Sequence, residues 1–129
     1  MLTYKNRIVF TGGTGRFAKS FKAVEKKTKY EFFFPKKNEL NILNTNSIKS
    51  YLKRKKPKYL IHMAGLSRPM ILHEKDISQS INKNIIGTAN ITKICSFLKI
   101  KLIYISTCYV YPGIKGNYTE GSPVKPINN

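Results

Sequence analysis

A glycine-rich segment near the start of the chain has the residues of a phosphate-binding turn. Gly12, Gly15 and Ala18 are spaced three residues apart, after an apolar run at 7–11 and before a stretch with helical spacing. Glycine lets the backbone approach a pyrophosphate closely, and the free N–H groups at a helix N-terminus favour negative charge. In this strand–turn–helix context the segment predicts a dinucleotide site, with a merely tight turn as the alternative.

Two lysines follow the next apolar run. Lys36 and Lys37 come shortly after residues 30–34, which have the composition of a second strand. At that place in a dinucleotide-binding unit an acid binds the ribose 2′-hydroxyl, whereas a base accepts a 2′-phosphate. The pair therefore favours NADP over NAD as the cofactor, although chance placement in a lysine-rich chain is the competing interpretation.

The histidines and cysteines do not have the spacing of a metal site. His62 lies in an apolar run and is expected to be a hydrogen-bonded core residue, and His73 has no ligand partner nearby in the sequence. Cys95 and Cys108 are too few for a disulfide framework, which indicates a reducing, cytoplasmic compartment. We expect no metal, and no nucleophilic role for Cys108, because no base adjoins it.

The elements that position these residues alternate along the chain. Apolar runs at 7–11, 30–34, 58–64 and 101–106 predict strands, and helices are expected from about residue 15, from about residue 45 to Pro57, and over 76–98. The first helix is expected to carry Phe17, Phe21 and Val24 on one face, and residues 45–47 offer capping side chains for the second. The third is expected to have one continuous apolar face, made of Ile77, Ile81, Ile85, Thr88, Ile91, Ile94, Cys95 and Leu98. Alternation of this kind predicts an α/β fold, a Rossmann-type parallel sheet with flanking helices. We expect one domain over residues 1–129, truncated after about four strands, with strand order 3-2-1-4.

The charge is strongly basic. The chain has 24 Lys and Arg against 6 Asp and Glu, a net charge of +18. The basic run at 53–58 has the composition of a nucleic-acid or anionic-lipid contact, but cations are also favoured at a solvated helix C-terminus. Because the lysines are spread along the whole chain, a nucleic-acid partner is not favoured. No stretch is long and apolar enough for a signal segment or a membrane span, so we expect a cytoplasmic protein without a membrane partner.

Several ordered segments together resemble one family, the extended short-chain dehydrogenases/reductases (NAD-dependent epimerases/dehydratases). The resemblance is strongest to the dTDP-4-dehydrorhamnose reductase branch and covers nearly the whole chain. The segments are the Thr-Gly-Gly-x-Gly-x-x-Gly pattern at 11–18 (with Ala18 for the last glycine), Glu39-Leu40-Asn41-Ile42, the strand at 57–65, Asn84-x-x-Gly87-Thr88, and Ser106-Thr107-Cys108-Tyr109-Val110 followed by 116–126.

The resemblance implies specific roles. It implies hydride transfer between NADP or NAD and the keto carbon of a nucleotide sugar, with Thr107 hydrogen-bonding the substrate carbonyl as a catalytic residue. It places Asn41 and Ile42 at the adenine. The pyrophosphate would be lined by Gly12, Gly15, Arg16 and Phe17, and the nicotinamide ribose by Met63, Ala64 and Gly65.

The resemblance also implies that the chain is the N-terminal part only. The family's Tyr-x-x-x-Lys segment is expected directly after Pro126-x-Asn128, so this chain would lack the catalytic tyrosine and lysine as well as the substrate domain. Tyr111 has Lys115 four residues later, but Pro112 and Gly113 preclude the helix that would align the two side chains. We therefore expect no activity from the chain as given, and self-association through the open edge of the last strand.

Two alternatives stay open. Beside the interpretation as part of a nucleotide-sugar reductase or epimerase, the chain is open to interpretation as a non-catalytic dinucleotide-binding module, or as a basic nucleic-acid-binding module in which the charge is the functional feature. An incomplete reading frame or fragment is a further interpretation.

Overall fold

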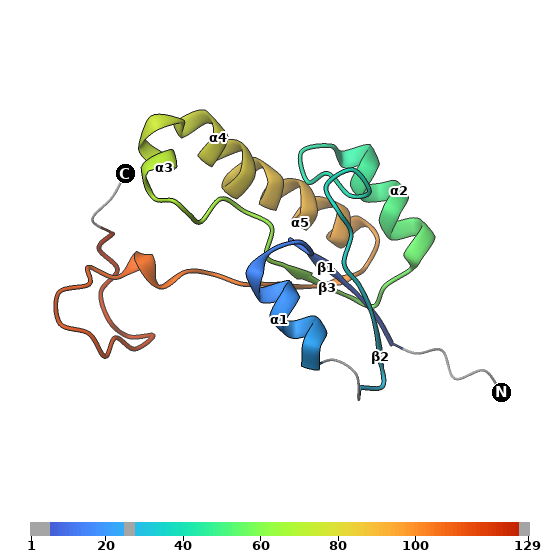
Figure 1. The fold of residues 1–129 in the computed structure, drawn as a ribbon, viewed down its shortest axis with the longest axis horizontal. Helices are drawn as coiled ribbons and strands as arrows, with labels where there is room; N and C mark the ends of the chain where they lie inside the picture. The colour runs from blue at the N-terminus through green and yellow to red at the C-terminus, as the bar shows by residue number, and fades with distance from the viewer. Residues whose placement is uncertain (1–5, 25–27, 127–129) are drawn as a thin grey trace.

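The computed structural model describes residues 6–24 and 28–126, and these form a four-stranded parallel sheet with helices on both faces (Figure 1). The strands are β1 (Asn6–Thr11), β2 (Tyr30–Phe33), β3 (Tyr59–His62) and β4 (Lys101–Tyr104). Helix α1 (Arg16–Val24) lies on one face, and α2 (Thr45–Lys55) and α5 (Gly87–Phe97) lie on the other. The predicted α/β fold class, a Rossmann-type parallel sheet of four strands, is confirmed.

The predicted strand order was wrong. The observed order is β2-β1-β3-β4, so the third strand lies beside β1, with Val9 opposite Leu60, instead of beyond β2. The observed order agrees with the packing of α2, the helix that connects β2 to β3. Ile48 and Leu52 of this helix pack in one core cluster with Val9 of β1 and Leu60 of β3. The connection from β2 therefore crosses over β1 before the chain enters β3.

Helix α1 covers the sheet through an aromatic cluster. The ring of Phe21 lies 5.6 Å from that of Phe10 and 5.0 Å from that of Phe32, centroid to centroid. The Phe17 ring lies on the same face, 5.9 Å from that of Phe10, although the residue is 55% exposed. Val24, which was also expected on this face, is 73% exposed, so the prediction was wrong for that residue. Ala18 is the buried residue of the helix, at 1% exposure.

Helix α2 begins and ends where the sequence predicted. The Asn44 side chain accepts from the Ser47 N–H as the N-cap, and Lys56 closes the helix in the left-handed conformation directly before Pro57. The basic run supplies the last turn, where Lys53, Arg54 and Lys55 meet the negative end of the helix dipole. Tyr51 and Leu52 face the core.

The helix expected over 76–98 contains a break in its periodicity. It consists of α4 (Ile77–Ile81), a π-helical turn η2 (Asn82–Ile86) and α5, and it is preceded by the short α3 (Ile71–Lys75). A π turn adds a residue to one turn, so a single apolar stripe cannot continue through it. Ile91 and Cys95 after the turn are buried, whereas Ile77 and Ile85 are each 60% exposed, contrary to the expected continuous face.

The last described segment is mostly irregular. After β4 come a single 3₁₀ turn η3 (Cys108–Val110) and turns to residue 126. Cys95 and Cys108 are both free, the first buried and the second exposed. Across the described ranges, no helix is long and apolar enough to cross a membrane.

Candidate functional site

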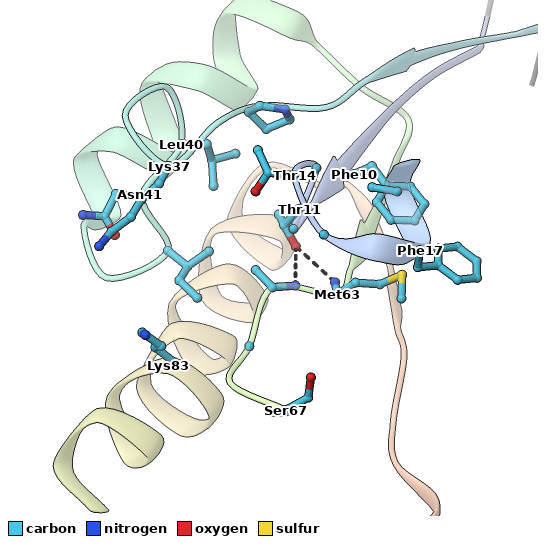
Figure 2. Close-up of a pocket in the computed structure, with 18 of the residues that line it drawn as sticks. Phe10, Thr11, Thr14, Phe17, Lys37, Leu40, Asn41, Met63, Ser67 and Lys83 are labelled. Atoms are coloured by element: carbon cyan, nitrogen blue, oxygen red, sulfur yellow. Dashed lines mark hydrogen bonds between the residues drawn. The ribbon is translucent and has the colours of Figure 1, made fainter. Parts of the chain in front are cut away.

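A cavity of about 540 Å³ lies at the carboxyl ends of β1, β2 and β3 (Figure 2). Its walls are the β1–α1 turn with the first turn of α1, the segment after β2, the segment after β3, and the π turn η2 through Lys83. In open parallel sheets, ligands bind outside the carboxyl ends of the strands, where neighbouring connections leave the sheet on opposite sides. Here α1 and α2 leave on opposite faces, so the cavity occupies that place.

The glycine turn is held by close backbone packing. Gly12 has φ +77°, and a Cβ built on it would lie 3.1 Å from the backbone of Met63 and Ala64. A Cβ on Gly13 would lie 2.8 Å from the carbonyl carbon of Phe34. The turn closes with the Gly15 N–H donating to the Gly12 carbonyl at 2.8 Å. The backbone thus leads directly into the N-terminus of α1 at the cavity wall. The sequence prediction did not include Gly13, although its position inside the glycine cluster was a usable signal.

The wall after β2 is anchored to the helices on the opposite face of the sheet from α1. The Asn41 side chain accepts from the Leu43 N–H at 3.0 Å, and the Asn41 N–H donates to Ser47 Oγ at 3.0 Å. The Ile42 carbonyl accepts from Asn90 Nδ2 at 3.1 Å, and the Ile42 side chain fills the space beside Gly87. Both predicted adenine residues therefore line the cavity on a fixed loop.

The wall after β3 is held from two sides. Thr11 Oγ1 accepts from the Met63 and Ala64 N–H groups at 3.2 and 3.3 Å, drawn as dashed lines in Figure 2. From the helix, Asn84 in the π turn accepts from the Leu66 N–H at 2.7 Å and donates to the Leu66 carbonyl at 3.0 Å. Asn84, the first residue of the Asn-x-x-Gly-Thr segment, therefore fixes the backbone directly after Met63, Ala64 and Gly65, the residues predicted to line the nicotinamide ribose.

The residues that line the cavity include cations and no carboxylate. Arg16, Lys37 and Lys83 contribute to the described walls, and none of the lining residues is Asp or Glu. Lys36 is not among them: the residue is exposed, and its backbone N–H donates to a Glu39 carboxylate oxygen at 2.8 Å. Of the predicted lysine pair, the structure brings Lys37 alone into the wall. An anionic ligand matches this charge distribution.

Nearly all of the predicted binding residues meet at this cavity. The lining includes Gly12, Gly15, Arg16, Phe17, Asn41, Ile42, Met63, Ala64 and Gly65. Thr107 is exposed beyond β4 and does not line it, and its Oγ1 accepts from the Tyr109 N–H at 3.1 Å. The sequence prediction did not include Leu40, Ser67 and Lys83, which also line the cavity. Their positions depend on how the loops and the helix pack in three dimensions, and no local sequence pattern indicates that packing.

Two Tyr-x-x-x-Lys spacings occur in the described chain, and neither forms a site. Tyr51, with Lys55 four residues later, is buried in the core, and burial raises the pKa of its hydroxyl. Tyr111, with Lys115, stacks on Tyr118 at 4.9 Å between ring centroids and donates its hydroxyl to the Thr119 carbonyl at 3.0 Å. Neither tyrosine lines the cavity.

His62 is a core residue, as predicted. It is fully buried, it hydrogen-bonds Thr11 and Thr88, and burial lowers its pKa to about 4, which keeps the ring neutral. Within the residues that the structure describes, no group of three or more His, Cys, Asp or Glu side chains is arranged to hold a metal ion.

Solved structures of similar chains share this fold. A dTDP-4-dehydrorhamnose reductase from Bacillus anthracis in complex with NADP superposes with a TM-score of 0.87 at 27% identity, over 99% of this chain and 46% of that one. The dTDP-4-dehydrorhamnose reductase from Yersinia enterocolitica superposes with a TM-score of 0.81 at 28% identity, over 96% of this chain and 43% of that one.

A curated relative with a different name matches over a similar range. Methionine adenosyltransferase 2 subunit beta from Xenopus laevis is 30% identical over 132 aligned residues, which cover 95% of this chain and 38% of the relative. This chain therefore spans less than half the length of the relatives it matches. The family model described as RmlD substrate binding domain matches residues 6–129, so the chain belongs to the RmlD substrate binding domain family.

Proposed function

We propose that the chain provides the NADP(H)-binding part of a nucleotide-sugar reductase of the dTDP-4-dehydrorhamnose reductase kind. Under this proposal, residues 1–129 are the N-terminal part of an NAD(P)-binding Rossmann domain. The observation that carries it is the cavity: a glycine turn, a helix N-terminus and three cationic side chains converge there without a carboxylate in the described walls. The solved Bacillus anthracis reductase, at 27% identity, holds NADP.

Each wall receives a part of the cofactor in this proposal. Gly12 and Gly15, with the first residues of α1, Arg16 and Phe17, bind the pyrophosphate through backbone N–H groups and charge. Asn41 and Ile42 contact the adenine. The 2′-phosphate is bound by Lys37, with Lys36 further out in the solvent. The nicotinamide ribose lies over the backbone of Met63, Ala64 and Gly65.

NADPH supplies a hydride when bound, and the residues of this chain would orient the acceptor. Because Thr107 Oγ1 already accepts from the Tyr109 N–H, its hydroxyl proton is available to donate to a sugar carbonyl. A hydroxyl of ordinary acidity polarises the carbonyl but does not deliver the proton that the reduced oxygen needs. The chain by itself is therefore proposed to bind cofactor without turning over a nucleotide sugar.

Calorimetric titration of the purified chain tests the proposal. NADPH is expected to bind more tightly than NADH, with one site per chain, and a random DNA duplex is the comparison ligand. Backbone-phosphate contacts with DNA weaken steeply as salt rises, whereas binding in a preformed cavity depends on salt less. Absence of NADPH binding at moderate salt would contradict the proposal, and duplex binding alone would favour the basic nucleic-acid-binding module.

A second candidate is a non-catalytic dinucleotide-binding subunit. It is favoured by the match to methionine adenosyltransferase 2 subunit beta, which extends over 95% of this chain. In this case the cavity binds NADP(H) as a ligand and the remaining surface contacts an enzyme. Co-elution with a methionine adenosyltransferase catalytic subunit in size-exclusion chromatography, enhanced by NADPH, would support it. Separate elution with and without NADPH would reject it.

A further inference from the structure

The glycine turn and the wall after β3 are joined at a single oxygen atom, Thr11 Oγ1. Thr11 Oγ1 accepts from the Met63 N–H at 3.2 Å and from the Ala64 N–H at 3.3 Å. A hydroxyl oxygen has two lone pairs and one proton. The two amides occupy both lone pairs, so the Thr11 hydroxyl proton still needs a hydrogen-bond acceptor.

His62 is the partner that takes this proton. Its Nδ1 lies 2.6 Å from Thr11 Oγ1, and both residues are buried, with Thr11 1% and His62 0% exposed. If Nδ1 carried a proton, Thr11 Oγ1 would face three donors with two lone pairs, and its own proton would be buried without an acceptor. Thr11 must therefore donate, and the neutral ring carries its proton on Nε2.

The other side of the ring agrees with this tautomer. Nε2 lies 3.1 Å from Thr88 Oγ1 on α5, so it can donate there. The ring also stacks on Tyr104 of β4, with centroids 5.8 Å apart, which fixes its plane. His62 therefore connects the β1 end, the β3 end and helix α5 through one ordered chain of hydrogen bonds.

We infer that His62 is a positioning residue for the cofactor site: by accepting the Thr11 hydroxyl proton at Nδ1, it fixes Thr11 Oγ1 as the acceptor that sets the spacing between the glycine turn and the Met63–Ala64 backbone. Gly12 follows Thr11 directly, and a Cβ built on it would lie 3.1 Å from the backbone of Met63 and Ala64. A rotation of the Thr11 hydroxyl group would release both amides and separate the two walls. This inference rests on the proposed cofactor function.

Two variants of His62 test the roles of the two ring nitrogens, Nδ1 and Nε2, one at a time. In His62→Asn the side-chain amide reaches the place of Nδ1 and retains a partner for Thr11. In His62→Gln it reaches the place of Nε2 and retains a partner for Thr88. Both variants remove the ring and leave the charge of the neutral residue unchanged, so each is the matched control of the other.

The readouts are NADPH affinity and the amide signals of the ¹⁵N-labelled chain. His62→Gln is expected to weaken NADPH binding about tenfold and His62→Asn less than about threefold, since a single internal hydrogen bond differs between them. The amide signals of Met63 and Ala64 are expected to move in both variants, because both remove the ring beside them, but to move further in His62→Gln than in His62→Asn. Equal effects of the two variants on affinity and on these signals would overturn the inference.

The unaltered chain gives an independent result. The ¹⁵N shifts of its ring nitrogens are expected to show Nδ1 without a proton and Nε2 with one, and a proton on Nδ1 would overturn the inference even if neither variant folds. If the unaltered chain does not bind NADPH, the proposed function fails. The ring-nitrogen shifts and the Met63 and Ala64 signals then still decide whether His62 holds the two walls together.

Discussion

The β1–β3 half of the sheet and the β4 side differ in how well they are packed. Val9 and Leu60 on the first are fully buried, whereas Ile103 and Tyr104 on the second are 45% and 53% exposed. The segments that line the cavity follow β1 and β3 of the packed half, among others, whereas Thr107 follows β4, the more exposed strand. The cofactor side of the site is therefore built on well-supported backbone, and the residue proposed to meet the substrate is not.

The largest difference is expected from truncating one side chain in each half. Leu60→Ala should lower the free energy of unfolding by about 2–5 kcal/mol, because it leaves a cavity in the packed core. Ile103→Ala should cost less than about 1 kcal/mol, because Ile103 is already 45% exposed. Urea unfolding followed by circular dichroism measures both. Similar losses would show that the two halves are equally packed.

The buried histidine makes the stability of the packed half depend on pH. The pKa of His62 is lowered from 6.5 to about 4 in the folded chain by burial. Between these values the unfolded chain binds the extra proton, so stability is full above about pH 6.5 and falls as the pH approaches 4. At about 1.4 kcal/mol per pH unit the loss amounts to about 3 kcal/mol. Urea unfolding across this range should show the slope.

His62→Asn is the control for that slope, since asparagine does not titrate. The variant should lose most of the pH dependence between 6.5 and 4. A slope that persists unchanged in the variant would assign the effect to other groups.

A pair of glycines tests whether the close packing at the cavity is what binding requires. Gly12 and Gly113 have φ of +77° and +70°, but only Gly12 has backbone atoms within 4 Å of a built Cβ. Alanine at either position should cost about 1–2 kcal/mol of stability through backbone strain. Gly12→Ala should in addition weaken NADPH binding about tenfold, measured by calorimetry. Equal NADPH affinity of the two variants would contradict the placement of the pyrophosphate.

A smaller effect is expected at the lysine pair. Lys37 lines the cavity and Lys36 does not. Lys37→Ala should weaken NADPH binding about fivefold through one lost charged contact, and leave NADH binding nearly unchanged. Lys36→Ala should change either affinity less than about twofold, since exposed charges are screened at physiological salt. If Lys36→Ala has the larger effect, the 2′-phosphate lies outside the described cavity.

The open side of the sheet is expected to produce weak self-association. The edge of β4 has no strand beside it in the described chain, and Ile103 and Ile105 are exposed there. Sedimentation velocity at two protein concentrations should show a concentration-dependent shift that Ile103→Lys reduces, because a charge opposes edge pairing. A monomer at both concentrations would contradict the predicted self-association.

The features that could be predicted from the sequence are those encoded by residues close together in the chain. The glycine turn, the start of α2 and the burial of His62 are encoded within a few neighbouring residues, and the structure confirms them. The N-cap itself is Asn44, one residue before the 45–47 segment that was expected to supply it. The strand order depends on where α2 packs, which residues far apart in the chain decide together. The exposure of Ile77 and Ile85 follows from a π turn that apolar spacing alone does not indicate.

The π turn also makes helix length a determinant of the site. The Gly87 N–H donates to the Asn82 carbonyl, five residues earlier, so the helix contains one residue more than an α-helix would need for the same rise. Deleting one residue from 82–86 would restore ordinary α-helical hydrogen bonding over about the same rise, and the side chains of the turn itself would be redistributed around the helix axis. Asn84 would then lose its place opposite Leu66, although no cavity residue had been substituted. A change in the length of this turn is therefore expected to alter how the wall after β3 is held, while the glycine turn on the other side of the cavity stays unchanged.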